Sequence, residues 1–302
     1  MSNDTKKTYE ELQAIVKEKA RQTNNQNNSP APSHLSEDKH PQKDFFIADI
    51  FDAVSFKDEI ATMEHPLFAL RAGDSKTRHY EHNGVSIKVV APTEYGLATI
   101  HDKDIWIYCI SKLVQAINEG EDPNPIVRFT IYDYLVTTNR GTSGQYYENT
   151  KNALDRLKNT GLTMEWDTKT HRVSKGIGLI NEWMVVEEKD GRMVRVEVKL
   201  PEWLYKSILE PKNLLTISPD YFRIRKPLDR RIYELARKHC GEQDSFKISL
   251  DLLYKKSGYT SPLKHFRAAI KSLAKSNDLP DYLVIYDLEK DLVMFTQRNE
   301  KS

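Results

Sequence analysis

The chain has 302 residues, of which 39% are hydrophobic and 10% aromatic, and its formal net charge is +1. This length and apolar content predict about two globular domains. Two distant cysteines, Cys109 and Cys240, give neither a disulfide framework nor closely spaced zinc ligands, which favours a reducing, cytoplasmic setting. No apolar run approaches the roughly 18 residues of a membrane span, and the polar N-terminus lacks a signal-peptide core, so we expect no membrane partner.

The N-terminal segment is polar and lacks the apolar residues of a folded core. Residues 5–21 form a weakly amphipathic pattern, and residues 21–43 are rich in Asn, Gln, Ser and Pro. We therefore expect residues 1–43 to be a disordered or weakly helical tail and linker. Order is expected to begin at Asp44, in a segment rich in Phe, Ile and acidic residues.

The first folded half contains three expected helices followed by strands. Residues 101–120 form an apolar helical pattern that stops at Gly120, and residues 127–139 predict a short strand entering a second helix. After a turn, residues 145–158 predict a third helix. The segments GLTMEWDTK, GIGLINEWMVVEEKDG and RMVRVEVKL predict antiparallel strands, with a turn at Lys189 to Gly191. Helices followed by a hairpin are the element order of a winged helix.

The second half repeats this order, which indicates an internal duplication. Residues 229–239 predict a helix, 246–258 a strand and a second helix, and 263–276 a third helix. DYLVIYD and DLVMFTQ predict the hairpin. A shift of about 119 positions superimposes apolar residues of the two halves: Phe129 on Ile248, Tyr134 on Leu253, Tyr147 on Phe266 and Leu154 on Leu273.

The expected fold class is therefore α+β, with two tandem winged-helix domains behind a disordered N-terminal tail. The first domain is expected over residues 44–200, with an additional α/β support, and the second over residues 201–302. In a helix-turn-helix, the second helix of the pair enters the major groove and packs its other face on the core.

In the first half, the polar face of the third helix suits base readout. Gln145, Asn149, Asn152 and Arg156 lie within about 60° of the helix circumference. Asn and Gln make paired hydrogen bonds with adenine, and Arg makes them with guanine. The alternative is an ordinary solvated face. In the preceding turn, Arg140, Thr142 and Ser143 are assigned to the DNA backbone.

In the second half, the corresponding helix carries a basic row beside its apolar stripe. A row of lysines suits phosphates better than base edges, whereas Arg267 could reach a guanine. A solvated lysine-rich face is the alternative. The residues assigned to the DNA backbone on this helix are Lys264, His265, Lys271 and Lys275.

A further basic cluster surrounds Pro227, which is expected in the first turn of a helix. From Tyr221 to Asn277 there are 14 Lys and Arg residues against 5 Asp and Glu, so the rest of the chain is net acidic. Such segregation is typical of a phosphate-binding face. The cluster is assigned to the DNA backbone, with interdomain ion pairs as the alternative; its members are Arg223, Arg225, Lys226, Arg230 and Arg231.

The sequence favours no catalytic residue, cofactor or metal site. Tyr146 and Tyr147 could suggest a DNA-nicking nucleophile, but such enzymes need two metal-binding histidines separated by one bulky residue, and no such triplet occurs in the sequence. His79, His82 and His101 are interpreted as polar surface or turn residues because no second group has zinc-like spacing. Neither GxxxxGK[ST] nor GxGxxG occurs.

Several long strings give the chain a family resemblance over residues 44–297: DFFIADIFDA, MEHPLFAL, RHYEHNG, GLATIHDKDIWIYCISKL, TNRGTSG and DYFRIRKPLDRRIYELARKHCG. With these strings the chain resembles the plasmid replication initiator protein A family. The resemblance implies a cytoplasmic, plasmid-encoded protein that binds repeats in double-stranded origin DNA and promotes duplex opening. It also implies contact with the host initiator and helicase, and switching between homodimer and monomer. The alternative function is a transcriptional repressor that binds its own promoter.

Overall fold

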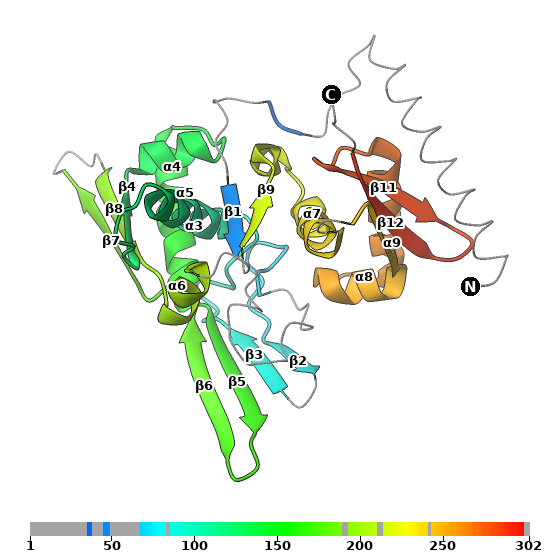
Figure 1. The fold of residues 1–302 in the computed structure, drawn as a ribbon, viewed down its shortest axis with the longest axis horizontal. Helices are drawn as coiled ribbons and strands as arrows, with labels where there is room; N and C mark the ends of the chain where they lie inside the picture. Colours follow the sequence, from blue (N-terminus) through cyan, green and yellow to red (C-terminus); the bar gives the residue numbers. More distant parts are fainter. Residues whose placement is uncertain are drawn as a thin grey trace.

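The computed structural model describes residues 35–37, 45–48, 67–82, 85–188, 193–209, 214–240 and 243–298 (Figure 1). Two hydrophobic cores organise these residues, one built from the first half of the fold and one mainly from the second. Ile107 of the first half packs into the second core, so the halves meet across a packed boundary. The expected mixture of helices and strands is confirmed. In the described part of the chain, every helix is too short or too polar to cross a bilayer.

The central helix of the first half is α3, Lys103–Asn118. Its apolar residues recur at helical spacing, and Trp106 and Cys109 are fully buried in the first core. The Trp106 Nε1–H donates to the carbonyl oxygen of Leu179 at 2.9 Å, which satisfies the polar atom of a buried ring. After the helix, Gly120 takes a positive φ of 78°, as the predicted glycine stop requires.

A strand, two short-linked helices and a hairpin follow α3. The Thr130 hydroxyl caps the first of these helices by accepting from the backbone N–H of Asp133 at 3.1 Å. The strands form a sheet of order β4-β8-β7, so the first strand lies beside the last. The elements are β4 Ile126–Phe129, α4 Ile131–Thr137, α5 Gly144–Asn159, β7 Glu182–Glu187 and β8 Met193–Lys199.

A second sheet in the first half contains a long hairpin inserted between α5 and β7. Its order is β2-β3-β5-β6, and the β5–β6 hairpin projects from the body of the molecule (Figure 1). One strand was expected from residue 176 to the turn predicted at 189–191, but the chain leaves the sheet where Leu179 and Ile180 enter the core. The strands are β2 Arg78–His82, β3 Val85–Val90, β5 Gly161–Asp167 and β6 Arg172–Gly178. The turn predicted at 189–191 lies outside the described residues.

The second half follows the predicted order closely. Pro227 is the first residue of its first helix, where its missing N–H costs no hydrogen bond. Its sheet has the order β10-β12-β11, again with the first strand beside the last. The elements are α7 Pro227–Cys240, β10 Ser245–Ser249, α8 Leu250–Ser257, α9 Leu263–Ser276, β11 Tyr282–Asp287 and β12 Leu292–Gln297.

The two halves therefore share one arrangement of strand, two helices and hairpin, interrupted in the first half by β5 and β6. The residues paired by the sequence shift occupy matching places. All of them are buried except Tyr147, which is half-buried against the first core. This agreement supports the duplication inferred from the sequence.

Connecting segments join the two halves. Leu204 and Ile208 of α6, Glu202–Ile208, pack in the first core, so that core continues past the boundary expected at residue 200. Strand β1, Phe45–Ala48, pairs antiparallel with β9, Leu214–Ile217, and the short helix η3, Pro219–Arg223, leads to α7.

One part of the expected N-terminal linker is also ordered. Leu35 forms an antiparallel bridge with Ile224, and the Ser36 N–H donates to the carbonyl oxygen of Arg223 at 2.8 Å. The expectation of disorder is therefore wrong for residues 35–37. The weak helix predicted over residues 5–21 lies outside the described residues.

Candidate nucleic-acid interface

The turn before α5 presents two hydroxyl side chains at the start of the helix. Thr142 and Ser143 are exposed, and Ser143 is the N-cap residue. Gly141 allows this turn to pack closely, because a Cβ at that position would lie 2.4 Å from the ring of Tyr146. Backbone N–H groups without intrahelical partners at a helix N-terminus favour anions, so this end of α5 suits a phosphate.

The outer face of α5 carries exposed amides. Gln145, Asn149 and Asn152 are exposed, as the predicted base-reading face requires. The Gln145 Nε2–H donates to Asn149 Oδ1 at 3.1 Å, which aligns two of these side chains along the helix. The opposite face of α5 is buried, through Thr150, Ala153, Leu154 and Leu157.

Arg156, the fourth residue predicted to contact bases, is partly exposed but paired with a buried carboxylate of the protein. Its Nε and Nη2 donate to the two carboxylate oxygens of Asp102, each at 2.8 Å. Asp102 is buried and also accepts from the backbone N–H of Thr99 at 2.7 Å. Arg156 therefore fastens the last turns of α5 to the start of α3, and a base contact would require this pair to open.

Helix α9 presents the basic row predicted from the sequence. Lys264, His265, Lys271 and Lys275 are all exposed. The other face of α9 packs in the second core, through Phe266, Ile270, Leu273 and Ala274. Helix α9 therefore has a buried apolar face and an exposed cationic face, as α5 has a buried face and an exposed amide face.

The exposed rows of α5 and α9 occupy equivalent positions in the two halves. The shift of 119 that superimposes the buried residues also places Gln145 on Lys264 and Asn152 on Lys271. The same surface is thus amide-rich in one half and cationic in the other.

Arg267 of α9 is joined to the turn between β11 and β12. Its Nη2 donates to Asp291 Oδ2 at 2.6 Å, and its Nε donates to the Tyr286 hydroxyl oxygen at 3.2 Å. The Arg267 side chain is 37% exposed, so it lies at the surface while engaged with the hairpin. A guanine contact by Arg267 would have to compete with Asp291.

The basic cluster around Pro227 divides into exposed and engaged members. Arg225 and Lys226 are exposed. Arg223 donates its Nε to the Ser36 carbonyl oxygen at 2.8 Å and pairs with Asp220 at the same distance. Arg231 donates its Nη2 to the Lys256 carbonyl oxygen at 2.9 Å, within the second half. Only part of the predicted phosphate-binding cluster therefore faces solvent freely.

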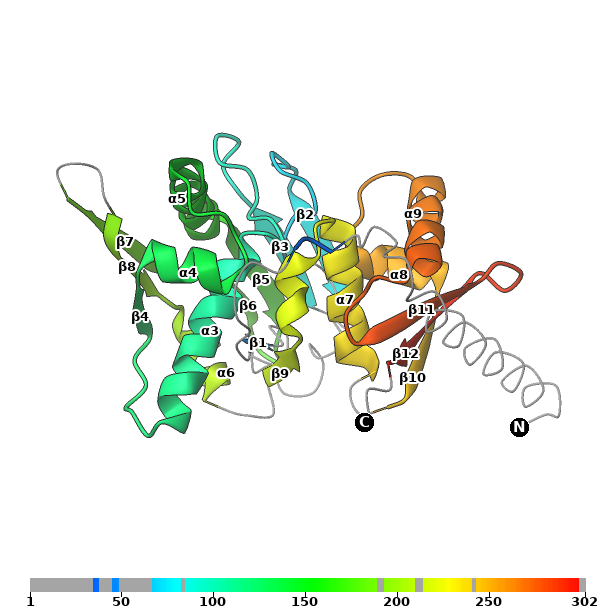
Figure 2. The same cartoon turned by 90° about the horizontal axis from the view of Figure 1, so that it is seen from above.

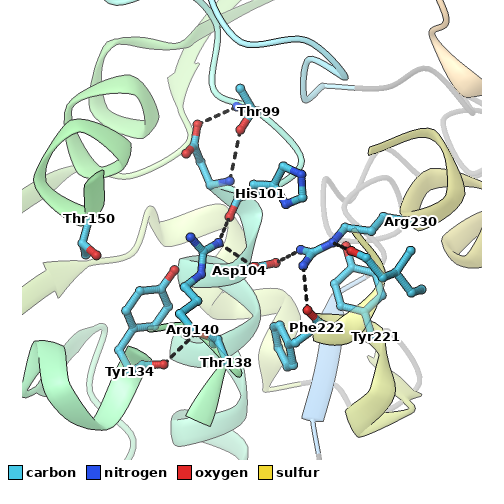
Figure 3. A network of polar contacts seen from close by, with 12 residues as sticks. Thr99, His101, Asp104, Tyr134, Thr138, Arg140, Thr150, Tyr221, Phe222 and Arg230 are labelled. Carbon is cyan, nitrogen blue, oxygen red and sulfur yellow. Dashed lines mark hydrogen bonds and ion pairs between the residues drawn. The ribbon is translucent and has the colours of Figure 1, made fainter. Parts of the chain in front are cut away.

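Arg230 belongs to a buried network at the boundary between the halves (Figure 3). Asp104 accepts from Arg230 Nη1 at 2.6 Å and from Arg140 Nη2 at 2.7 Å. Asp104 is fully buried and Arg230 is 4% exposed. Arg230 thus forms the interdomain ion pair that was the alternative prediction for this cluster. Arg140, which was assigned to the DNA backbone, is likewise turned toward the protein interior.

A second buried pair lies beside the first. Lys103 pairs with Glu234 at 2.9 Å, and Glu234 also accepts from the Tyr221 hydroxyl at 2.8 Å. Lys103, Asp104 and Glu234 were not predicted to be site residues. A detectable signal existed, because these charged residues stand among apolar residues at helical spacing in HDKDIWIYCI and RRIYELA.

The ionisation of this network follows from its burial and its charges. Burial on its own would raise the pKa of Asp104, but Arg230 and Arg140 outweigh it and hold that pKa below its usual range. For His101, burial and then the nearby Arg230 lower the pKa to about 4. His101 lies in the turn that leads into α3, one of the two placements expected for it, and its partly buried imidazole is neutral near pH 7.

Helices α5 and α9 lie along the same side of the molecule. Figure 2 shows α5 toward one end of the long axis and α9 toward the other, both in the upper part of the view, with α7 between them and α3 below α5. The β7–β8 and β11–β12 hairpins extend toward the two outer ends. The two helices that carry the exposed amides and the exposed lysines therefore lie on one side of the molecule.

No metal-binding group of His, Cys and acidic residues occurs in the described part of the chain. Cys109 and Cys240 are both buried and unpaired with each other, and burial raises the pKa of each thiol. Cys109 packs as an apolar residue in the first core.

Comparisons with known proteins define the family. Residues 57–284 match the family model described as replication initiator protein A, so the chain belongs to this family of replication initiators. The predicted family resemblance is thereby confirmed. The chain is 48% identical over 260 residues to a putative replication protein of Wigglesworthia glossinidia brevipalpis, with 85% of this chain and 94% of the relative covered.

Solved structures share the fold at low sequence identity. Two crystal structures of domains 2 and 3 of RctB match with TM-scores of 0.53 and 0.56 at 13% identity. Each match covers 78% of this chain and 96% of the RctB chain. The arrangement of the two halves therefore also occurs in a protein of very different sequence.

Proposed function

We propose that the protein initiates plasmid replication by binding double-stranded origin DNA with both halves, each acting as a winged-helix domain. The observation that carries this proposal is the placement of α5 and α9 on one side of the molecule, with exposed polar rows (Figure 2). Membership of the replication initiator protein A family supports the replication role.

The winged-helix assignment rests on the repeated element order. In each half, a strand precedes two helices and a hairpin, and the first strand pairs with the last. Helices α4 and α5, and likewise α8 and α9, are then the helix pairs, and the second member of each pair enters a major groove. The β7–β8 and β11–β12 hairpins are the wings.

The two helices contribute different interactions. The amides of Gln145, Asn149 and Asn152 read base edges, because an amide offers a donor and an acceptor to adenine. The lysines of α9 contact phosphates, which release counterions on binding and supply affinity with little sequence preference. Further exposed groups assigned to the DNA backbone are Thr142, Ser143, Arg225 and Lys226.

Binding two groove segments about one helical turn apart would explain recognition of repeated sites. Each DNA segment contributes its own binding free energy. The corresponding binding constants therefore multiply, and the discrimination between sequences increases. The bound protein would then promote duplex opening and recruit the host initiator and helicase in the bacterial cytoplasm. This role requires neither catalysis nor a cofactor from the protein.

Hydroxyl-radical footprinting on fragments of the replicon that encodes the protein tests this proposal. We expect competitor-resistant protection of two neighbouring groove segments within one fragment that contains direct repeats. Protection of one segment would overturn binding by both halves, and uniform weak binding to all fragments would overturn base readout.

The replication role needs a separate test. A minimal origin should replicate in cells only when the protein is supplied, and should fail with a Gln145→Ala, Asn149→Ala, Asn152→Ala triple variant. A Lys206→Ala variant is the matched control, since Lys206 is exposed on α6, on the side away from α5 and α9 (Figure 2). Replication without the protein, combined with repression of its own promoter, would identify a transcriptional repressor instead.

A further inference from the structure

We infer that Asp104 is a positioning residue that holds α5 and α9 in one relative orientation, and thereby sets the spacing of the two DNA segments that the protein accepts. The spacing role rests on the proposed DNA binding by both halves. The holding role concerns the free protein and can be measured without DNA.

Asp104 connects the two halves with its two carboxylate oxygens. Oδ2 accepts from Arg140, which lies in the turn that leads into α5. Oδ1 accepts from Arg230, on α7 of the second half. One buried carboxylate thus joins the approach to the first DNA-reading helix with the central helix of the second half.

Both ends of α5 are attached to the start of α3. Arg140, before α5, binds Asp104, and Arg156, in the last turns of α5, binds Asp102 with both carboxylate oxygens. These contacts restrain α5 relative to α3, because one holds the turn before the helix and the other holds its last turn.

On the other side of the boundary, Arg230 is fixed by several groups. Its Nε donates to the Ile224 carbonyl oxygen at 2.8 Å, its Nη2 donates to the Phe222 carbonyl oxygen at 3.1 Å, and its guanidinium lies over the Tyr221 ring. Helix α7 packs in the same core as α8 and α9. A continuous set of contacts therefore runs from α5 through α3 and α7 to the core that carries α9.

The buried ion pairs at this boundary favour one relative position of α3 and α7. Buried ion pairs contribute little net stability, yet the loss of one partner leaves a charge without compensation. Sliding α3 against α7 would separate Asp104 from Arg230 and also Lys103 from Glu234, whose side chains are 7% and 6% exposed. The boundary therefore resists small displacements that a purely apolar contact would tolerate.

A fixed arrangement of the two helices implies a fixed spacing of their sites. Adding one base pair moves the second site by about 3.4 Å and rotates it by roughly 35°. A variant with a loosened boundary should still bind DNA with the added base pair, because its two helices can move with the displaced site. Wild-type protein should bind such DNA more weakly.

The first arm of the test measures the separation of α5 and α9 without DNA. Spin labels are placed at Asn152→Cys and Lys271→Cys, two exposed positions. The natural thiols at Cys109 and Cys240 are buried and do not compete for the label. Pulsed electron resonance then gives the distribution of distances between the labels.

We expect one narrow distribution for the labelled protein, and a distribution at least about twice as broad after Asp104→Asn or Arg230→Met. Arg230→Met is the second variant because it leaves Asp104 paired with Arg140 and keeps the first half intact. The matched control is Glu165→Gln, which removes a surface ion pair with Arg172 on the β5–β6 hairpin. A narrow distribution in both folded variants, judged by circular dichroism, would overturn the holding role.

The second arm measures binding of unlabelled protein to origin fragments whose two protected segments are moved by one or two base pairs. For wild-type protein and Glu165→Gln, we expect affinity to fall about tenfold or more with each change. For Asp104→Asn and Arg230→Met, we expect weaker binding at the natural spacing and less than about a threefold variation across spacings. A wild-type profile in these variants would overturn the spacing role.

The two arms separate this inference from the proposed function. If wild-type protein protects only one segment, DNA binding by both halves and the spacing role fail together. The label distances still decide whether Asp104 holds the helices.

Discussion

Arg267 on α9 and Asp291 in the turn between β11 and β12 form an ion pair, with 2.6 Å between Nη2 and Oδ2. The hydrogen bonds that the Arg267 guanidinium donates to Asp291 and Tyr286 raise its pKa above the ordinary value. Asp291 itself adopts a positive φ of 50°, so the carboxylate is presented by a tight turn. This pair connects the proposed phosphate-binding helix to the proposed wing.

We predict that Arg267→Ala and Asp291→Ala weaken binding to origin DNA by similar factors, about three- to tenfold, without altering base preference. Both changes free the wing from α9, and neither removes a base contact in the arrangement seen here. Competition titrations with a set of single-base-pair variants of the origin measure affinity and preference together. Arg267→Ala that relaxes preference at one base pair, while Asp291→Ala does not, would instead show that Arg267 leaves Asp291 and reads a base.

We predict that Asn149→Ala relaxes discrimination at one adenine-containing base pair by about 1–3 kcal/mol. Asn149 is exposed on the proposed reading face of α5, and Gln145 donates a hydrogen bond to it. The measurement is the binding constant for fragments that carry each of the four base pairs at each protected position. Glu148→Ala is the matched control on the same helix, since Glu148 is exposed beside the amide row. Unchanged preference in Asn149→Ala would contradict base readout by this residue.

Lys271→Ala should weaken binding to all sequences alike and reduce the salt slope of log K by about 1. The exposed ammonium of Lys271 contacts a phosphate in the proposed complex, and each such contact releases about one counterion. Titrations at several salt concentrations give the slope. Lys206→Ala should leave the slope unchanged, because Lys206 belongs to α6, which Figure 2 shows away from α5 and α9. Equal slopes for the wild type and Lys271→Ala would show that Lys271 does not contact a phosphate.

Most elements could be predicted from local sequence because their signals are local. The helix over 263–276 was predicted with its observed bounds, since its apolar residues recur at helical spacing between Pro262 and Asn277. Strand β2 and helix α6 were not predicted because such short segments resemble loops, whereas β3 was missed although Val85, Ile87 and Val89 alternate with polar residues. The split of the strand expected before the turn at 189–191 depends on where Leu179 enters the core, which is a tertiary effect.

The arginines show why the candidate site was harder to predict. A sequence shows that Arg230 lies in a basic cluster, but its partner Asp104 is 126 positions away. Whether an arginine faces solvent or a buried carboxylate depends on that tertiary contact, not on its neighbours in sequence. The exposed amides of α5 were predictable because they lie opposite an apolar face whose period is local.

We predict that the protein loses about 2 kcal/mol of unfolding free energy between pH 7.5 and pH 5 through His101. The pKa of His101 is lowered from 6.5 to about 4 in the folded protein. The unfolded chain therefore binds more protons between these values, so His101 contributes no penalty above pH 6.5 and an increasing penalty as pH falls toward 4. Urea unfolding at both pH values measures the change.

Between the same two pH values, His101→Gln should lose about 2 kcal/mol less unfolding free energy than the wild type, because glutamine does not titrate. An equal pH dependence of the unfolding free energy for wild type and His101→Gln would contradict the lowered pKa of His101 in the folded protein. Asp104 acts in a different range: its lowered pKa contributes stability above pH 3.8 that is lost as pH falls further, below the pH values compared here.

We predict that Asn139→Gly loosens the ordered part of the N-terminal segment. Asn139 has a φ of 56°, and its Nδ2 donates to the carbonyl oxygen of Glu37 at 2.8 Å. Glycine accepts this backbone conformation without strain, so the change removes the amide while the turn before α5 is kept. We expect about 1 kcal/mol less unfolding free energy and faster proteolysis near Ser36.

Ser36 is also bound by Arg223, which donates its Nε to the Ser36 carbonyl oxygen. Arg223→Lys should therefore accelerate cleavage at the same place, because lysine cannot reproduce the planar guanidinium contact. If residues 35–37 were attached only to the turn before α5, Asn139→Gly would accelerate cleavage and Arg223→Lys would not. Acceleration by both variants would show that residues 35–37 bind the first half and the linker to α7 together, which ties the N-terminal segment to the same boundary that Asp104 holds.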